Sequence, residues 1–429
     1  MREMKDSGIE WIGAIPQNWQ LSKIGSLYTQ RNEKVSDKDY QPLSVTMQGI
    51  LPQLATAAKT DDGDNRKLVR VGDFAINSRS DRRGSCGISP LDGSVSLINI
   101  ILTPRTAMHP GYYNWLFHTT LFADEFYKWG HGIVADLWTT RWQEMKSITV
   151  PVPEYAEQER IAAFLDAECA EIDAVLEKTR ASIEEYKKLK QAVITQAVTK
   201  GVRGDRPMKD SGIEWIGDIP AEWRKTQLRH CAAIKSGITL GKKYEKTDSL
   251  VERPYLRVAN VQDGYVDLSV LTTIEVTQDE DLKYRLRAGD VLMTEGGDRD
   301  KLGRGCVWHG EIEPCLHQNH IFAVQTSKDT LLPEFLEYLT VSDVGRSYFD
   351  VTAIKTTNLA CTSSSKVLAF TIPLPSVEEQ AEIVEALNTK CAGIDALVAK
   401  KQQYLTEIEN YKKSLIYEYV TGKKEVHPL

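Results

Sequence analysis

The sequence has none of the features that place a protein in a membrane or outside the cell. Its 429 residues contain no apolar run of about 18 residues, and Met1 is not followed by a basic and then apolar leader. We therefore expect no membrane contact and a cytoplasmic location. The seven cysteines are scattered and form no Cys-x-x-Cys pair, which is typical of reduced thiols rather than of a disulfide framework.

Motifs for catalysis and cofactor binding are also missing. There is no Gly-x-Gly-x-x-Gly turn, residues 237–243 lack the spacing of a phosphate-binding loop, and no Asn/Asp-Pro-Pro-aromatic motif of an adenine methyltransferase occurs. One stretch is rich in cysteine and histidine: Cys306, His309, Cys315, His317 and His320. Its spacing matches no zinc finger, so we expect strand residues of mixed burial there. The sequence predicts a chain that is not an enzyme and holds no metal or cofactor.

The charge balance is mildly acidic and does not by itself select a partner. The formal net charge is −7, yet residues 20–150 carry a net +2 and residues 224–370 a net −1. Because nucleic-acid binding depends on a local basic face rather than on the sum, charge neither supports nor excludes DNA.

One segment of the chain occurs twice. Residues 4–19 recur as residues 208–223, with 13 of 16 positions identical at an offset of 204. A second matched pair closes each half: residues 148–153 and 370–375 are each followed by a long helical pattern, now at an offset of 222. The centres between the matched ends hardly agree. A duplication that keeps its frame while its centres diverge indicates one scaffold with two different recognition surfaces.

Tryptophans recur within the repeated segment, as Trp11 and Trp19 in the first copy and Trp215 and Trp223 in the second. Because the two halves keep this segment nearly identical, we expect these side chains to anchor the globular part, or head, of each half, or to dock the same partner twice. We do not expect them to read different targets.

Both helical stretches carry an a/d seam of about five heptads. The first seam is Leu165, Cys169, Ile172, Leu176, Thr179, Ile183, Tyr186, Lys190, Val193 and Ala197, and the second keeps the same frame from Leu387 to Tyr419. A helix over 155–198 would span roughly 65 Å. We expect it to pair antiparallel with the equivalent helix over 377–419, as an intramolecular coiled coil. The alternative is two helices that each pack separately on their own head.

The regions between the repeats carry short strand patterns with turns, at 253–264 and 287–293 and more weakly at 41–45 and 70–76. Helical spacing over 112–128 and 332–348 makes each head α+β. The predicted fold is thus α+β with two globular heads, two long helices and pseudo-two-fold internal symmetry. Its predicted parts are a first head with its repeat segment (1–150), a helix (151–200), a second repeat segment and head (201–370), and a second helix with a tail (371–429).

Together these features resemble the specificity subunit of type I restriction-modification systems. The resemblance is carried by the Gly-Ile-Glu-Trp-Ile-Gly-x-Ile-Pro-x-x-Trp segment that opens each half, by Gly-Asp turns before strands, and by the Pro-x-Pro-x-x-x-Glu-Gln start of each long helix. It covers essentially the whole chain.

The resemblance implies two target-recognition domains, each reading one half of a split double-stranded DNA target, held apart by two antiparallel helices. It also implies partners: modification subunits, expected to be two, that methylate adenine with S-adenosylmethionine, and restriction subunits that use ATP and Mg²⁺ to move along and cut DNA. Those cofactors would be bound by the partners, not by this chain.

DNA contacts are expected from loops rich in Arg, Lys, Asn and Gln. In the first head the densest run follows a predicted buried strand and holds Asn77, Arg79, Arg82 and Arg83. The matching place in the second head holds Arg299, Lys301 and Arg304. Further candidates are Lys242, Lys243 and Tyr244 for phosphate, and Asn260 and Gln262 for adenine. Solvated charged loops and turn-capping by Asn260 and Gln262 remain open, as does a coiled-coil adaptor with two protein-binding heads and no DNA.

Overall fold

The computed structural model describes residues 2–53, 62–133, 138–245, 248–297, 302–355 and 360–426. The chain divides into two compact units, one of residues 1–180 with 403–429 and one of residues 181–402. Each unit contains one head and a stretch of both long helices. Among the helices in the described ranges, none is long and apolar enough to cross a membrane.

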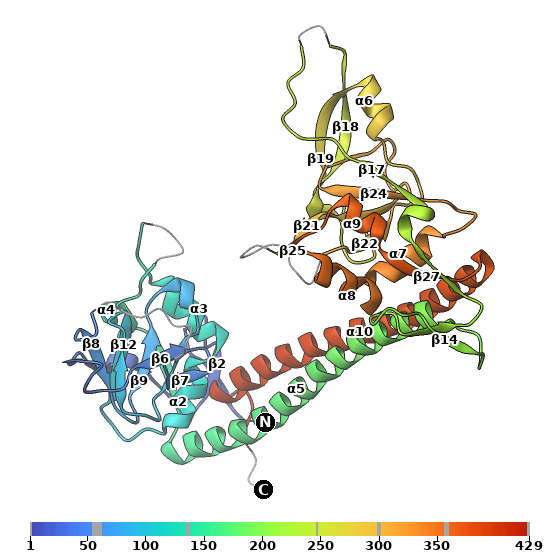
Figure 1. Cartoon of the computed structure of the whole chain (residues 1–429). Coiled ribbons are helices and arrows are strands. Elements are labelled where there is room, and N and C mark those ends of the chain that lie inside the picture. The colour runs from blue at the N-terminus through green and yellow to red at the C-terminus, as the bar shows by residue number, and fades with distance from the viewer. Residues whose placement is uncertain are drawn as a thin grey trace. The chain divides into compact units, whose positions relative to one another are not determined.

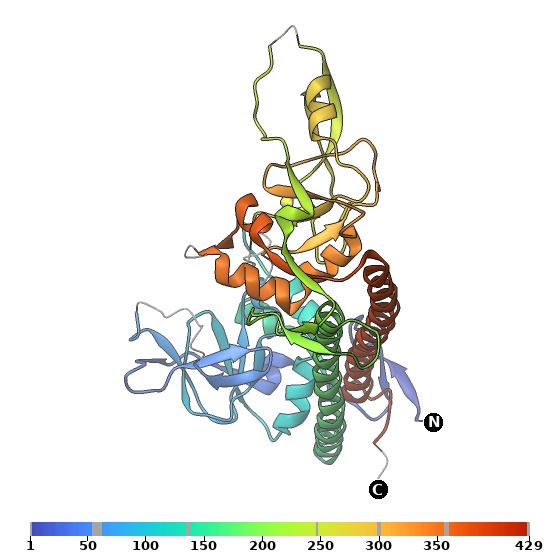
Figure 2. The ribbon, with the colours of Figure 1, turned by 45° about the vertical axis from the view of Figure 1, so that its right-hand side comes forward.

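The two long helices are α5 (Tyr155–Lys200) and α10 (Val377–Val420), which lie side by side (Figure 1, Figure 2). In the first unit the ring centroids of Phe164 and Tyr419 are 4.4 Å apart, and Lys412 Nζ lies 2.6 Å from the Asp173 carboxylate. Residue numbers therefore rise on α5 as they fall on α10, and the packing is antiparallel.

The second unit shows the same antiparallel pairing. Lys190 Nζ lies 2.7 Å from the Asp395 carboxylate, and Lys401 Nζ lies 5.7 Å from the centroid of the Tyr186 ring. Of the predicted seam, Leu165, Cys169, Leu176, Ile183, Ala197, Leu387, Cys391, Leu405 and Leu415 are buried. The prediction of paired helices is confirmed, and the alternative of helices packed only on their own heads is wrong.

The first head is built on a four-stranded antiparallel sheet in the order β10-β9-β12-β4. Two helices of the stretch predicted to be helical, α2 and α3, contribute buried aromatic side chains to the core that contains β9. The bounds are β4 Tyr28–Arg31, β9 Phe74–Asn77, β10 Cys86–Ile88, β12 Asn99–Pro104, α2 Pro110–Phe117 and α3 Thr120–Lys128.

A smaller sheet, β11-β8-β5, and a hairpin of β6 and β7 complete this head. Their bounds are β5 Lys34–Val35, β6 Leu43–Thr46, β7 Gly49–Pro52, β8 Arg66–Val69 and β11 Gly93–Val95, with short helices α1 Ile24–Leu27, η1 Ser80–Arg82 and α4 Trp142–Met145. β3 (Gln20–Lys23) pairs with β13 (Thr149–Val152), so the chain enters and leaves the head through one two-stranded ladder.

The second head repeats this plan. Its four-stranded sheet has the order β17-β24-β20-β22, which matches β4-β12-β9-β10 strand for strand, and β16 pairs with β27 as β3 pairs with β13. The bounds are β16 Arg224–Gln227, β17 Ala232–Ser236, β20 Val291–Thr294, β22 Gly305–Val307, β24 Ile321–Thr326, α7 Pro333–Val341, α8 Asp343–Thr352, α9 Ser364–Ala369 and β27 Thr371–Leu374. The α+β prediction for both heads is confirmed.

The second head adds a long antiparallel pair, β18 with β19, and a short sheet β21-β26-β25. The bounds are β18 Leu250–Leu256, η3 Leu228–His230, η4 Val258–Asn260, β19 Thr272–Thr277, α6 Gln278–Tyr284, β21 Gly296–Gly297, β23 Leu316–His317, β25 Ile354–Lys355 and β26 Ala360–Cys361.

Each predicted helical stretch of a head forms two helices rather than one. In the first head Thr119 breaks the stretch, because its side chain accepts a hydrogen bond from Phe122 N and so starts α3 as a new helix. Ser342 stands at the corresponding break between α7 and α8.

The repeated segment forms a small hairpin in each unit, β1 (Met4–Asp6) with β2 (Ala14–Pro16) and β14 (Met208–Asp210) with β15 (Asp218–Pro220). The tryptophan after each hairpin is buried. Trp19 Nε1 donates to Glu157 at 2.9 Å, and Trp223 Nε1 donates to Glu379 at 3.0 Å. Both acceptors lie in the first turn of a long helix.

An arginine completes each of these sites, which we call the tryptophan sockets. Arg2 lies 2.5 Å from Glu157 and 5.4 Å from the Trp19 ring, and Arg206 lies 2.6 Å from Glu379 and 5.2 Å from the Trp223 ring. The predicted packing role is confirmed for Trp19 and Trp223, since each socket joins the repeated segment to the start of a long helix.

Candidate nucleic-acid interface

The arginine loop, residues 78–84 of the first head, directly follows the buried strand β9. All four residues of β9 are buried, whereas the three arginines that follow, Arg79, Arg82 and Arg83, are exposed. The base of the loop is closed by hydrogen bonds: Asn77 N donates to Ser85 O at 2.8 Å, and Asn77 Oδ1 accepts from Arg79 N at 3.0 Å. Asn77 is buried and holds the loop in shape.

The guanidinium groups of this loop have weak local partners. Arg82 lies 3.8 Å from Asp81, with 69% of its side chain exposed. Arg83 pairs with Asp124, with 51% of its side chain exposed, and stands 5.9 Å from the centroid of the Tyr127 ring. Because exposed ion pairs contribute little stability, a phosphate or a guanine edge can replace these carboxylates at small cost.

A second segment lies against the arginine loop, and the sequence patterns did not predict it. Residues 129–133 and 138–140, which we call the first hairpin, bond to the loop through Ser80 N to Trp138 O at 2.9 Å and Thr140 N to Ser78 O at 3.0 Å. Only a weak feature of the sequence points to this segment. Thr140 matches Thr362 at the offset of 222 that relates the two helices.

In the second head the corresponding loop follows the buried strand β20. Arg299 and Lys301 lie outside the described residues. Arg304 is half-buried and directly precedes β22. Glu295 anchors the start of the loop, because its N–H donates to His320 O at 2.9 Å and its carbonyl accepts from Thr362 N at 2.8 Å.

Lys242 and Tyr244 converge on one carboxylate. Lys242 pairs with Glu280, and Tyr244 donates its hydroxyl proton to Glu280 at 2.9 Å. Burial raises the pKa of Glu280, but hydrogen bonds from Lys242, Thr277 and Tyr244 outweigh it and lower the pKa to about 2. The Lys242 ammonium therefore faces a fixed negative charge, while its neighbour Lys243 is exposed.

Asn260 and Gln262 make the contacts expected of residues that cap a turn, which is the alternative to adenine reading. Asn260 is buried, its Oδ1 accepts from Arg257 N at 2.8 Å, and its Nδ2 donates to Asp267 O at 2.8 Å and to Val270 O at 2.9 Å. Gln262 Nε2 donates to Ala259 O at 2.8 Å. Both N–H groups of the Asn260 amide are used within the turn, so reading of adenine by Asn260 would require at least one of these bonds to break.

The structure thus gathers the candidates of the first head in one loop and distributes those of the second over different elements. Arg304 stands beside β22, Lys242 and Tyr244 are tied to α6 through Glu280, and Asn260 belongs to η4. The arginine loop is the most coherent candidate interface.

The cysteine and histidine stretch does not converge on a point. Cys306 lies in β22 and His317 in β23, both are buried, and His317 Nδ1 is 3.1 Å from Ile321 O. Burial lowers the pKa of His317 to about 4. Within the described ranges no three Cys, His, Asp or Glu residues form a metal-binding group.

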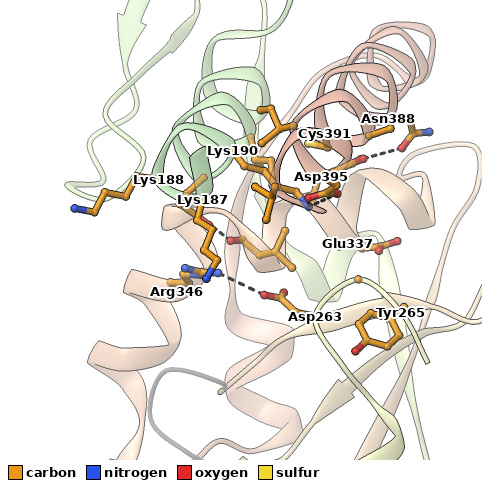
Figure 3. A pocket seen from close by; sticks show the side chains of 18 of the residues that line it. Lys187, Lys188, Lys190, Asp263, Tyr265, Glu337, Arg346, Asn388, Cys391 and Asp395 are labelled. Atoms are coloured by element: carbon orange, nitrogen blue, oxygen red, sulfur yellow. Dashed lines mark hydrogen bonds and ion pairs between the residues drawn. The ribbon is translucent and has the colours of Figure 1, made fainter. Parts of the chain in front are cut away.

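A pocket of about 870 Å³ lies in the second unit, between the helices α5 and α10, the helix α7 and the turn at 263–265 (Figure 3). Several of its cations have carboxylate partners: Lys187 lies 2.7 Å from Glu184, Lys190 lies 2.7 Å from Asp395, and Arg346 lies 3.6 Å from Asp263. Burial raises the pKa of Glu337, on the wall of the pocket, to about 7. The pocket thus lies where the second head packs against the two long helices.

Comparison with known proteins gives a consistent result. No family model matches the chain. It is 23% identical to the type I restriction enzyme EcoKI specificity subunit of Escherichia coli K12 over 96% of this chain and 90% of that protein. It is also 25% identical to the putative type I restriction enzyme MjaX specificity subunit of Methanocaldococcus jannaschii, a match that spans 47% of that protein and 48% of this chain.

Solved structures with the same fold come from the same kind of system. A chain from a study of complex assembly and conformational transition in a type I R-M system matches with a TM-score of 0.72 and 16% identity, covering 96% of this chain and 99% of that one. The HsdS subunit from Thermoanaerobacter tengcongensis matches with a TM-score of 0.51 and 18% identity, covering 96% and 98%. With the internal repeat, the paired helices and a relative that matches along nearly the whole sequence, the chain is similar in sequence and fold to the specificity subunits of type I restriction-modification systems.

Proposed function

We propose that this chain is the DNA-recognition subunit of a type I restriction-modification complex, and that each head reads one half of a split double-stranded target. The observation that carries the proposal is the difference between the two loops that follow β9 in the first head and β20 in the second. β9 and β20 occupy the same place in identical sheets, yet the loops that follow them differ in sequence. A repeated frame with diverged loops is what two readers of different sequences need.

The charge of the arginine loop supports DNA as the ligand. Its exposed arginines are held against carboxylates that are themselves exposed, so binding to a phosphate backbone exchanges one partner for another and releases counterions. Arginine also reads guanine through two hydrogen bonds.

The repeated frame supports two copies of one partner. The repeated segments, residues 4–19 and 208–223, are nearly the same in both units, so any protein that docks on them meets the same surface twice. We assign this surface to two modification subunits, with restriction subunits joining the complex through them. The lengths of α5 and α10 would set the number of unread base pairs between the half-sites.

Catalysis belongs to the partners in this proposal. The sequence holds no methyltransferase motif and no phosphate-binding loop. S-adenosylmethionine would be bound by the modification subunits, ATP and Mg²⁺ by the restriction subunits, and the complex would work in the cytoplasm. The chain itself would be non-catalytic.

Co-expression with the modification subunits of its own system tests the proposal. The complex should shift a random-sequence duplex in a gel, and sequencing of methylated DNA should reveal a split target with adenines modified in both halves. A complex that assembles but neither binds nor methylates DNA would favour the rival function, an adaptor that displays two protein-binding heads.

Exchange of one head makes the test sharper. Replacing residues 24–147 with the matching segment of the EcoKI specificity subunit leaves the ladder of β3 and β13 intact. The half-site read by the first head should change while the other half-site stays the same. A change in both half-sites would contradict the assignment of one half-site to each head.

A further inference from the structure

The first hairpin and the arginine loop form one continuous edge. Thr139 pairs with Arg79 on one side and with His131 on the other, so three backbone segments run next to one another. The pairing of Thr139 with His131 has both hydrogen bonds, at 3.0 and 3.2 Å. The segments pack closely at Gly130, because a Cβ there would stand 3.1 Å from Tyr127 O and 3.2 Å from Trp138 Cβ.

The second head has the same arrangement. β21, in the loop after β20, pairs with β26, and β26 pairs with β25, so a hairpin again lies beside the candidate loop (Figure 1). Thr362 N bonds to Glu295 O just as Thr140 N bonds to Ser78 O. The hairpin therefore belongs to the repeated frame of the protein.

Both hairpins expose apolar side chains. Ile133 is 104% exposed and Trp138 is 39% exposed, and in the second head Ile354, in β25, is 58% exposed. The backbone is held in place at Trp138, whose carbonyl accepts from Ser80 N at 2.9 Å, and at Ile354, which pairs with Cys361. Apolar side chains held in water beside exposed arginines indicate a surface that is covered when a ligand binds.

We propose that each hairpin is a second DNA-contacting element, in which Ile133 and Trp138 of the first head and Ile354 of the second press against base pairs of their half-site. This inference rests on the proposed function, since it needs heads that read DNA. The neighbouring arginines supply the attraction to phosphate, and the apolar groups contact thymine methyl groups or a partly unstacked base step.

The divergence of the hairpins selects DNA over a protein partner. At the offset of 222, Trp129, Ile133 and Trp138 correspond to Val351, Lys355 and Ala360. A modification subunit that docks twice would need the same side chains twice, as the repeated segments at 4–19 and 208–223 provide. Half-sites of different sequence need different side chains on the same backbone.

The test uses the full chain in complex with its modification subunits and a duplex that contains the mapped target. The variant Ile133→Ala with Trp138→Ala should weaken binding about tenfold, as expected for the loss of buried apolar contact. Its dependence on salt should stay that of the wild type, because no phosphate contact is lost. The variant Arg82→Ala with Arg83→Ala should instead reduce the salt dependence.

Val71→Ala is the matched control. Val71 is 65% exposed and lies before β9, at the opposite end of the strand from the arginine loop, so its loss should leave binding unchanged. Ile133→Ala alone guards against misfolding, since a fully exposed side chain adds nothing to the core. It should weaken binding in the same direction by a smaller factor.

Three results would overturn the inference in distinguishable ways. If the double variant binds the target as tightly as Val71→Ala, the hairpin does not touch DNA, although the proposed function stands. If the double variant loses its modification subunits in size-exclusion chromatography, the hairpin is a protein contact. If the wild-type complex itself has no affinity for DNA, the proposed function fails and the inference with it.

Discussion

Replacement of Glu379 by alanine probes how strongly a tryptophan socket holds its unit together. The Glu379 residue is only 2% exposed, and its carboxylate accepts from Trp223 Nε1 at 3.0 Å and pairs with Arg206 at 2.6 Å. The Arg206 side chain is 11% exposed. Alanine would leave the buried Trp223 N–H without its acceptor and would remove the buried carboxylate partner of Arg206, which would keep only Glu222 and Lys200 O.

Breaking a buried ion pair by removing one partner costs about 3–5 kcal/mol. In a domain of the size of the second unit, 1 kcal/mol shifts Tm by roughly 2–4 °C. The transition of the second unit should therefore fall by on the order of 10 °C. Differential scanning calorimetry of the full chain measures this, and hydrogen exchange of residues 208–223 assigns the transition to the second unit.

Glu382→Ala is the control on the same helix. Glu382 pairs with Arg203, and the two side chains are 48% and 49% exposed, so water and salt screen the pair and it contributes little to stability. If Glu379→Ala lowers Tm no more than Glu382→Ala does, the buried socket is not what stabilises the unit, and the argument from burial is wrong.

Four further outcomes are expected. Because the pKa of Glu337 is raised to about 7, the stability of the second unit should fall by up to about 3 kcal/mol as the pH rises from 4.5 to 7, and Glu337→Gln should abolish this fall in chemical denaturation at each pH. Because the pKa of Glu280 is lowered to about 2, its contribution should be complete above pH 4.5 and lost as the pH falls toward 2, and Lys242→Met should weaken this acid dependence. Asn260→Ala should destabilise the second head by about 1–3 kcal/mol without changing the methylated sequence, and a changed half-site in a folded variant would instead assign adenine reading to it. One heptad inserted in both α5 and α10 should lengthen the target spacer by roughly three base pairs with both half-sites unchanged, whereas an active variant with the old spacer would show that the helices do not set it.

The elements that the sequence predicts well are those encoded over long stretches. The heptads after Pro153 and Pro375 predict helices over 155–198 and 377–419, and the structure has them over Tyr155–Lys200 and Val377–Val420. The structural role of Trp19 and Trp223 follows from repetition alone, because a side chain kept in both halves cannot serve to distinguish their targets.

The candidate interface is less accessible to sequence reasoning, because it depends on contacts between residues far apart in the chain. Arg79 and Thr139 are neighbours only once the sheet has formed, and no local pattern announces their pairing. An asparagine such as Asn260 has the same donors and acceptors whether it caps a turn or reads a base. Only the positions of Arg257 N and Asp267 O show how those groups are used here.

The end of α10 packs against the first copy of the repeated segment, and the end of α5 leads along the chain into the second copy. Tyr417 and Lys423 both donate to Ile12 O, at 2.9 and 2.6 Å, and Tyr112 donates to Val420 O at 2.7 Å. No peptide bond joins α10 to residues 4–19, yet the two are in contact there. At the other junction, the chain itself joins α5 to residues 208–223.

The order of parts is therefore circular, and the place at which the polypeptide is opened is separable from the fold. Residues 202–205, between α5 and β14, are exposed and supply an alternative opening. A chain opened at Gly204 and closed by a linker from Val426 to Arg2 would keep every contact described here, and its two heads would exchange their order of synthesis without exchanging their half-sites.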